Sequence, residues 1–137
     1  MENLKQIRWK QRFSNFEKAY KLLKEGIETS SDISSKLEKE GIIQRFEYTF
    51  ELAWKTLKDY LEYGGILVNL PREIIKQSFA KSLITDGDAW IDMLEKRNLI
   101  AHTYDEKNFE TVIGLIKDKY FKAIEQAYEL LLEKSRK

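Results

Sequence analysis

The sequence predicts an all-α protein, an antiparallel up-and-down bundle of four long helices and one short helix. Three observations favour this class. Apolar residues recur at spacings of three and four along most of the 137-residue chain, which is the period of a helix with one buried face. No stretch alternates with the period of two that marks a β-strand. One proline and six glycines punctuate the chain and divide it into helical stretches.

The first expected helix covers about Leu4 to Glu25. Gly26 is expected to end it, because glycine is favoured just past a helix C-terminus. Five large apolar side chains share one face of this helix and are expected to enter the core: Trp9, Phe13, Phe16, Tyr20 and Leu23.

The second helix is expected to be the longest, from about Leu37 to Tyr63, after a Ser- and Asp-rich loop or frayed start. Gly64 and Gly65 stop it. Its apolar face comprises Ile42, Phe46, Phe50, Ala53, Leu57, Tyr60 and Leu61. A short third helix begins near Pro71, since proline is favoured in the first turn, and it carries Ile74, Ile75 and Phe79.

A turn at residues 86–88 with a capping aspartate predicts the start of the fourth helix, which runs from about Asp88 toward His102. The last helix covers about Phe109 to Glu133. One stripe of this helix is apolar throughout and should face the core: Val112, Ile113, Ile116, Tyr120, Ala123, Ile124, Ala127 and Leu131.

Length and composition limit the domain organisation and the kinds of site that the chain can form. The length of 137 residues fits one domain spanning 1–137. The 24 basic and 23 acidic residues nearly cancel, so any nucleic acid would have to bind at a local site. Without cysteine and with a single histidine, neither a thiolate nor a His-rich metal site is possible, and no metal or cofactor is expected. The N-terminus lacks the apolar stretch of a signal peptide and no run is long enough to span a membrane, so a cytoplasmic protein without a membrane partner is expected.

Arg97 is the first candidate functional residue. On a helical wheel with about 100° per residue, it falls in the middle of the apolar arc of the fourth helix. A buried guanidinium without a partner is costly, so a carboxylate, an anion or a subunit boundary should lie near it. Glu47, at the edge of the second helix's apolar face, is one possible partner. Arg97 is then either a structural ion pair, a stem that packs while its head reaches water, or an anion site.

His102 and Tyr104 follow Arg97 closely. On a continuous helix, Arg97 and His102 would point about 140° apart, and they converge only if the helix ends between them or if two copies of the segment meet. Tyr104 would share a side with Arg97. The plain alternatives are a packed or surface histidine and a packing ring with a bonded hydroxyl. Asn98, directly after Arg97, is a possible supporting residue.

The spacing Arg97-x4-His102-x-Tyr104 resembles the Arg-x4-6-His signature of the HEPN superfamily, in the form seen in HepT toxins. The segment from Gln44 to Lys55, QRFEYTFELAWK, adds specificity. Together with Pro71-Arg72-Glu73 and with WIDML at residues 90–94, it resembles the nucleotidyltransferase substrate-binding protein family within HEPN. The likeness covers about residues 7 to 132.

The resemblance implies a helical homodimer that works with a small separate nucleotidyltransferase. It also implies a toxin ribonuclease that cleaves RNA without metal at a cleft between the subunits. By the same resemblance, Arg97 and His102 are catalytic, and Tyr104 is the residue to which the partner adds AMP to neutralise the toxin. The alternative is a non-catalytic nucleotide- or substrate-binding subunit of the nucleotidyltransferase, and a third possibility is a helical scaffold.

Overall fold

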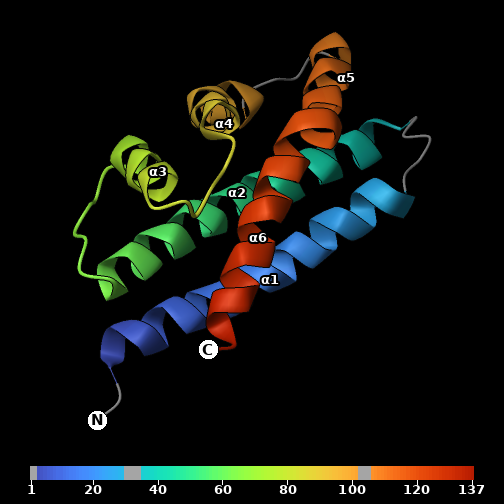
Figure 1. Cartoon of the computed structure of the whole chain (residues 1–137). Coiled ribbons are helices and arrows are strands. Elements are labelled where there is room, and N and C mark those ends of the chain that lie inside the picture. The colour runs from blue at the N-terminus through green and yellow to red at the C-terminus, as the bar shows by residue number, and fades with distance from the viewer. Residues whose placement is uncertain (1–2, 30–34, 102–105) are drawn as a thin grey trace.

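A computed structural model describes the backbone of residues 3–29, 35–101 and 106–137, and the side chains within 3–29, 35–97 and 108–137 (Figure 1). Every regular element in these ranges is helical. The all-α class and the helical bundle are therefore confirmed. None of the helices in the described ranges is both long enough and apolar enough to cross a membrane.

Helices α1 (Leu4–Thr29) and α2 (Lys36–Tyr63) form a long antiparallel pair that makes the base of the molecule (Figure 1). The five expected core residues of α1 are all buried. The expected face of α2 is also buried, except that Tyr60 stays partly exposed at the edge of the core. The start of α2 is capped by Ser35, whose Oγ accepts from the Glu38 backbone N–H at 3.0 Å and donates to the Glu38 carboxylate.

The prediction that Gly26 ends the first helix is wrong, because α1 continues to Thr29. Gly26 is buried against α2. A Cβ atom at this position would lie 3.0 Å from both Ile42 Cδ1 and Arg45 Nη1. Arg45 Nη1 in turn donates to the Leu22 carbonyl at 2.8 Å. The glycine therefore serves the close approach of two helices and not a helix end.

Helix α3 (Pro71–Ala80) starts at the proline, as expected, and closes with a left-handed residue. The Leu83 N–H donates to the Ser78 carbonyl at 2.8 Å, and between them Ser82 has φ +62°. Gly65 holds the corresponding place after α2, with φ +93°. A serine in this conformation is strained where a glycine is not.

Phe79 of α3 departs from the expected pattern. Ile74 and Ile75 are buried as predicted, but Phe79 is 55% exposed. The buried side of this short helix consists of Ile74, Ile75 and Ser78, and Phe79, the residue after Ser78, lies outside it. The Phe79 ring instead rests near Gly87, where a Cβ atom would lie 3.3 Å from the ring.

The C-terminal helix is continuous through α5 (Glu106–Leu115), η1 (Ile116–Tyr120) and α6 (Phe121–Ser135). All eight residues of the expected stripe are buried. The sequence did not indicate the π-helical turn η1, in which the Phe121 N–H donates to the Ile116 carbonyl. The wider turn keeps both Ile116 and Tyr120 fully buried. This helix crosses over α1 and α2 (Figure 1).

Two reciprocal hydrogen bonds join α1 to α6. Tyr20 donates to Glu125, and Tyr128 donates back to Glu17 at 2.6 Å. The two tyrosine rings stack with their centres 4.2 Å apart. Burial, together with the bond to Glu17, raises the pKa of Tyr128 to about 12. Both phenols therefore stay protonated wherever the helix pair is intact at ordinary pH.

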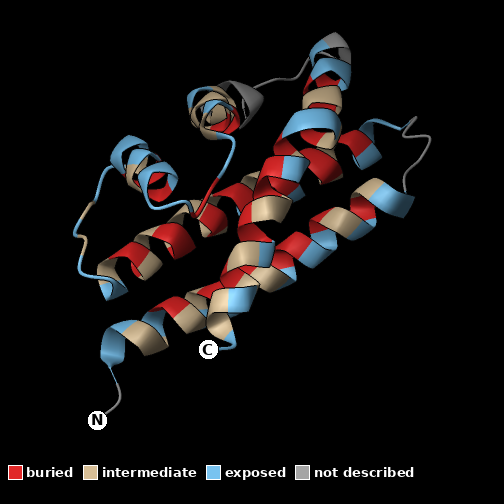
Figure 2. Cartoon of the chain, viewed as in Figure 1, coloured by how far each residue is buried: buried red, intermediate tan, exposed pale blue. Residues whose placement is uncertain are grey.

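Helix α4 (Gly87–Ala101) packs on α2, α3 and η1, and Figure 1 looks almost along its axis. Its start is capped as predicted, since Asp86 Oδ1 accepts from the Ala89 N–H at 3.0 Å. Trp90 and Met93 are fully buried against the rest of the bundle. Figure 2 shows the buried surfaces of the elements facing inward. Helix α4 thus carries residue 97 to a position over the middle of α2.

Candidate functional site

Arg97 lies on α4 and reaches across to α2. Its Nη1 atom is 3.0 Å from Glu51 Oε1, and the two side chains are 30% and 38% exposed. The expectation that the guanidinium needs a carboxylate is therefore met. At this exposure the pair contributes little to stability, because water screens both charges. The pair can open toward solvent at small cost.

Glu51 is the carboxylate that pairs with Arg97, where the sequence suggested Glu47. Glu47 lies one helical turn earlier on α2 and lines the same cavity. Glu51 is well placed because its second oxygen, Oε2, accepts the indole N–H of Trp54 at 3.1 Å. One carboxylate thus holds a guanidinium with one oxygen and a tryptophan ring with the other.

A cavity of about 530 Å³ opens at this point between α2 and α4. Arg97, Glu51 and Trp54 line it together with Glu47, Phe50, Lys55 and Pro71. Lys55 Nζ lies 5.7 Å from the centre of the Trp54 ring, within the range of a cation–π contact. The cavity therefore combines an aromatic surface with both signs of charge.

Three polar contacts fix α4 on its neighbours and so position Arg97. Besides the Glu51 contact to α2, Asp92 accepts the Tyr120 hydroxyl of η1 at 2.6 Å. Glu95 pairs with Arg72 of α3 at 3.2 Å. Two of these contacts, Arg97–Glu51 and Arg72–Glu95, are screened by water and contribute little, so the bond to the buried Tyr120 contributes most to holding α4 in place.

Asp92 has the most partners of these groups, since it accepts from Tyr120 and pairs with Lys96 and Lys119. Burial acts to raise its pKa, but the hydrogen bond from Tyr120 and the ammonium groups of Lys96 and Lys119 outweigh burial and lower it. Burial and the same bond raise the pKa of Tyr120 above its usual value. At neutral pH the pair is therefore a carboxylate and a protonated phenol.

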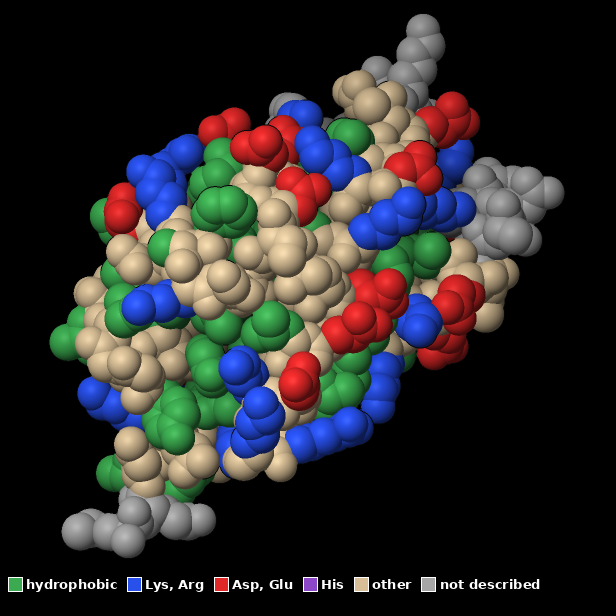
Figure 3. Space-filling view, viewed as in Figure 1, with side chains coloured by type: hydrophobic (Ala, Val, Ile, Leu, Met, Phe, Trp, Pro, Cys, Tyr) green, Lys and Arg blue, Asp and Glu red, His purple; other side chains and the backbone are tan. Residues whose placement is uncertain are grey.

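The side chains that line the cavity carry both signs of charge, with Glu47 and Glu51 beside Lys55 and Arg97. Figure 3 shows basic and acidic side chains interleaved over the visible face, in keeping with the formal net charge of +1. Among the described residues, no group of three or more His, Asp or Glu side chains is placed to hold a metal ion. Attraction for an anion in this region must come from Arg97 and Lys55 themselves.

Three of the predicted site residues lie outside what the structure describes. His102 and Tyr104 fall in the undescribed segment 102–105, and the side chain of Asn98 is likewise not described. The backbone of α4 extends to Ala101, and Arg97 is the last residue of this helix whose side chain is described. The structure therefore tests the surroundings of Arg97 only.

The family model for proteins described as nucleotidyltransferase substrate binding protein like matches residues 11–133. The chain belongs to this family. The match spans α1 through nearly all of α6, so the resemblance of the Gln44–Lys55 segment extends to the whole bundle. The matched range includes both members of the ion pair between α4 and α2, Arg97 and Glu51.

Two similar proteins support this family assignment. Over 83 residues it is 30% identical to a Haemophilus influenzae protein named "Probable ribonuclease HepT", and the match covers 57% of each chain. The chain thus spans little more than half the length of that relative. A crystal structure of a Thermus thermophilus protein has a TM-score of 0.75 with 33% identity, covering 89% of this chain and 99% of that one. The family assignment and the HepT-like relationship are both supported.

Glu51 and Trp54 are site residues that sequence reasoning did not single out. Both lie in the segment that carries the family resemblance, and a signal for them was present. Glu47 and Glu51 are one turn apart on α2, and Trp54 follows Glu51 by three residues, so all three share one side of the helix. Trp54 was absent from the expected apolar face of α2, which left a large aromatic ring unexplained.

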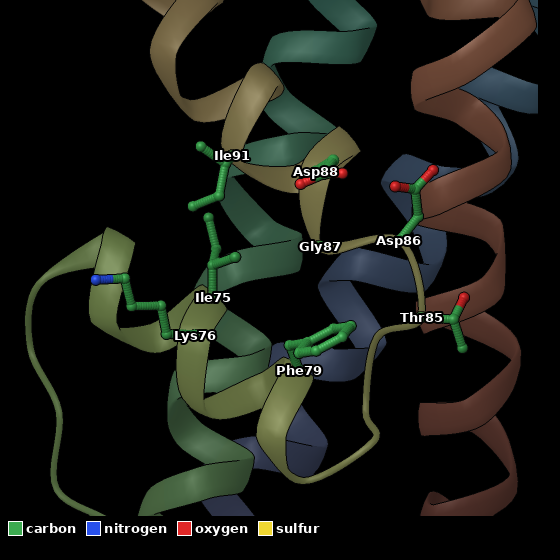
Figure 4. A pocket seen from close by; sticks show the side chains of 8 residues that line it. All are labelled: Ile75, Lys76, Phe79, Thr85, Asp86, Gly87, Asp88 and Ile91. Carbon is green, nitrogen blue, oxygen red and sulfur yellow. The ribbon is translucent and has the colours of Figure 1, made fainter.

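A second cavity, of about 510 Å³, lies between α3 and α4 (Figure 4). Ile75 and Ile91 point toward one another across it, with Phe79 below. Its one basic residue, Lys76, is paired with Glu73, and Asp86 uses Oδ1 as a helix cap. This cavity shares no lining residue with the Arg97 cavity, and no arginine or tryptophan lines it.

Proposed function

We propose that this member of the family is a HepT-like ribonuclease subunit that acts with a small nucleotidyltransferase. The observation that carries the proposal is Arg97, a partly exposed guanidinium held at an open cavity in a chain related to a probable ribonuclease HepT. Arginine suits this role because its planar fork matches a phosphate. In the resting chain Glu51 occupies the fork, and a phosphate of RNA takes its place.

The proposed reaction uses the RNA's own 2′-hydroxyl. That oxygen attacks the adjacent phosphorus, its proton passes to a base, and the 5′-oxygen leaves with a proton from an acid. Arg97 stabilises the charge that develops on the phosphoryl oxygens. His102 is the one side chain of the sequence with an ordinary pKa near neutrality. Two chains in a homodimer would bring two histidines to one cleft, one as base and one as acid.

Tyr104 is the proposed site of regulation. Its hydroxyl oxygen attacks the α-phosphorus of ATP on the partner nucleotidyltransferase, pyrophosphate leaves, and AMP remains on the tyrosine. The added phosphate lies seven residues from Arg97 in sequence and can pair with its guanidinium. Modification is thus expected to block RNA binding while changing stability little, because no core residue is altered.

The test begins with purified protein and RNA in the presence of a chelator. Cleavage is expected in the parent and in Arg8→Ala, which removes an exposed arginine of α1 paired with Glu62. Cleavage is expected to be lost in Arg97→Ala and His102→Ala, with helix content unchanged by circular dichroism. Equal cleavage by the His102 variant would overturn its catalytic assignment.

Two further measurements test the modification of Tyr104 by the nucleotidyltransferase and the formation of a homodimer. Incubation with the nucleotidyltransferase and ATP should add AMP to the parent but not to Tyr104→Phe, as read by intact-mass spectrometry. An adduct on both proteins, or on neither, contradicts the regulatory role. Light scattering at micromolar concentration should give twice the chain mass, whereas a monomer would exclude a cleft shared between subunits.

A second function is favoured by the description of the family itself, which names substrate binding to a nucleotidyltransferase. In that case the cavity binds a nucleotide without cleaving RNA. The same chelator assay separates the two functions. A parent protein that binds nucleotide at the Arg97 cavity but leaves RNA intact supports the binding subunit.

A further inference from the structure

Trp54 differs from the other two tryptophans of the chain. Trp9 and Trp90 are 1% and 0% exposed and belong to the core. Trp54 is partly exposed on the side of α2 that faces the Arg97 cavity. Trp54 packs against the core with only part of its ring. The part left at the open cavity is available for contact with a ligand.

The ring is held in a set orientation. Its N–H donates to Glu51 Oε2 at 3.1 Å, and Lys55 Nζ lies 5.7 Å from the ring centre. Glu51 Oε1 is 3.0 Å from Arg97 Nη1. The indole and the guanidinium are therefore fixed by the two oxygens of one carboxylate, and both line the same cavity of about 530 Å³.

This pair of groups matches the two parts of a nucleotide. A base stacks on an aromatic ring, and a phosphate binds a guanidinium. We propose that the cavity between α2 and α4 binds one nucleotide unit of single-stranded RNA, with its base on Trp54 and its phosphate on Arg97. The inference rests on the proposed function in one respect, the role of Arg97 as the phosphate-binding residue.

Single-stranded RNA fits the site better than a duplex. A base in a duplex is covered on both faces by its neighbours, so its ring cannot lie on an indole. A free nucleotide offers the same base and phosphate, and the experiment distinguishes these two sources. In either case the phosphate displaces the Glu51 carboxylate from Arg97. This exchange costs little, because Arg97 is 30% exposed and Glu51 is 38% exposed, so water already screens the pair.

The test uses a short 2′-O-methyl oligoribonucleotide with a fluorescent label. Such a strand has no free 2′-hydroxyl and cannot cleave itself, so binding is measured by anisotropy whether or not the protein is a ribonuclease. Trp54→Leu is expected to weaken binding about tenfold, since stacking one base on an aromatic ring contributes roughly 1–3 kcal/mol. Trp54→Tyr keeps an aromatic face and is expected to stay within about threefold of the parent.

Tyr48→Leu is the matched control. Tyr48 is another exposed aromatic residue of α2, 61% exposed, but it does not line the cavity. Its variant is expected to bind as the parent does. Thermal melts confirm that each variant is folded. Ligand-induced quenching of intrinsic tryptophan fluorescence gives a second readout, because Trp54 is the tryptophan that solvent reaches.

The outcomes are distinct. Equal affinity of the Trp54→Leu and Tyr48→Leu variants for the labelled strand overturns the inference. Annealing the strand to its complement should weaken binding, and unchanged binding of the duplex also overturns it. Full competition by AMP at the strand's own concentration assigns the site to free nucleotides and contradicts an RNA site. If the methylated strand binds through Trp54 but natural RNA is never cleaved, the proposed ribonuclease function fails and this inference stands.

Discussion

Removing the Asp92 carboxylate should show how strongly α4 is fixed to the C-terminal helix. Tyr120 is fully buried, and its hydroxyl donates to Asp92 Oδ2 at 2.6 Å. Asp92→Ala leaves that hydroxyl without its acceptor. A hydrogen bond to a charged group contributes about 1.5–3 kcal/mol, and an unpaired buried group costs about as much. We expect the free energy of unfolding to fall by about 2–3 kcal/mol.

The double variant supplies the decisive comparison. Tyr120→Phe alone should cost about 1 kcal/mol, because Asp92 keeps Lys96 and Lys119 as partners and is 21% exposed. In Asp92→Ala with Tyr120→Phe no buried hydroxyl is left unpaired, so the two losses should not add. A coupling of about 1.5 kcal/mol is expected from urea unfolding followed by circular dichroism. Additivity within about 0.5 kcal/mol would refute the reasoning.

The same contact has a pH dependence with a definite sign. The pKa of Asp92 is lowered in the folded chain, so the folded state binds the proton more weakly than the unfolded one. The contribution of the carboxylate is complete above the unfolded value of about 3.9 and is lost as the pH falls toward the lowered folded value. The stability difference between the parent and Asp92→Ala should therefore shrink below about pH 4.

Three further predictions concern helix ends, glycines and tyrosines. Ser82→Gly should raise the free energy of unfolding by about 1 kcal/mol, because residue 82 has φ +62°, which strains a serine but not a glycine. Gly65→Ala should lower it by about the same amount, because φ is +93° there. Urea unfolding measures both changes. Gly114→Ala should stabilise the protein by about 0.5–1 kcal/mol, because a Cβ atom at residue 114 meets nothing within 4 Å. Gly26→Ala should give no such gain, because its Cβ atom would lie 3.0 Å from side chains of α2. The melting temperature of Gly114→Ala should therefore exceed that of Gly26→Ala. Because the pKa of Tyr128 is raised to about 12, stability should fall as the pH rises from about 10 to 12, and alkaline unfolding of Tyr128→Phe should lack this contribution.

Periodicity predicted most of the fold because a bundle's core repeats with the helix. The faces of α1, α2 and the C-terminal helix were predicted nearly residue by residue. Gly26 was misread because one sequence signal, a glycine after an apolar face, serves both a helix end and a close helix contact. The π turn at residues 116–120 was missed because the buried stripe passes through it without a visible break.

The candidate site was predicted only in part, and the reason lies in its geometry. Arg97 could be found alone, since a charge within an apolar arc is visible on one helix. Its partner could not, because Glu47 and Glu51 lie on the same side of α2 and only the axial position of α4 decides between them. That position depends on contacts to three other elements. Pairings between helices distant in sequence follow from packing, which a single helix pattern does not contain.

The Arg97–Glu51 pair also bears on how an RNA strand would reach the proposed site. The 24 basic and 23 acidic residues nearly cancel, and charges of both signs are interleaved on the face shown in Figure 3, so the net charge gives the chain no field to steer a polyanion. In the resting chain even Arg97 is neutralised by Glu51. Affinity must then come from the local exchange of a carboxylate for a phosphate and from stacking on Trp54. Such a site contacts few phosphates, so its affinity should depend only weakly on salt, unlike that of a protein that coats RNA with lysines.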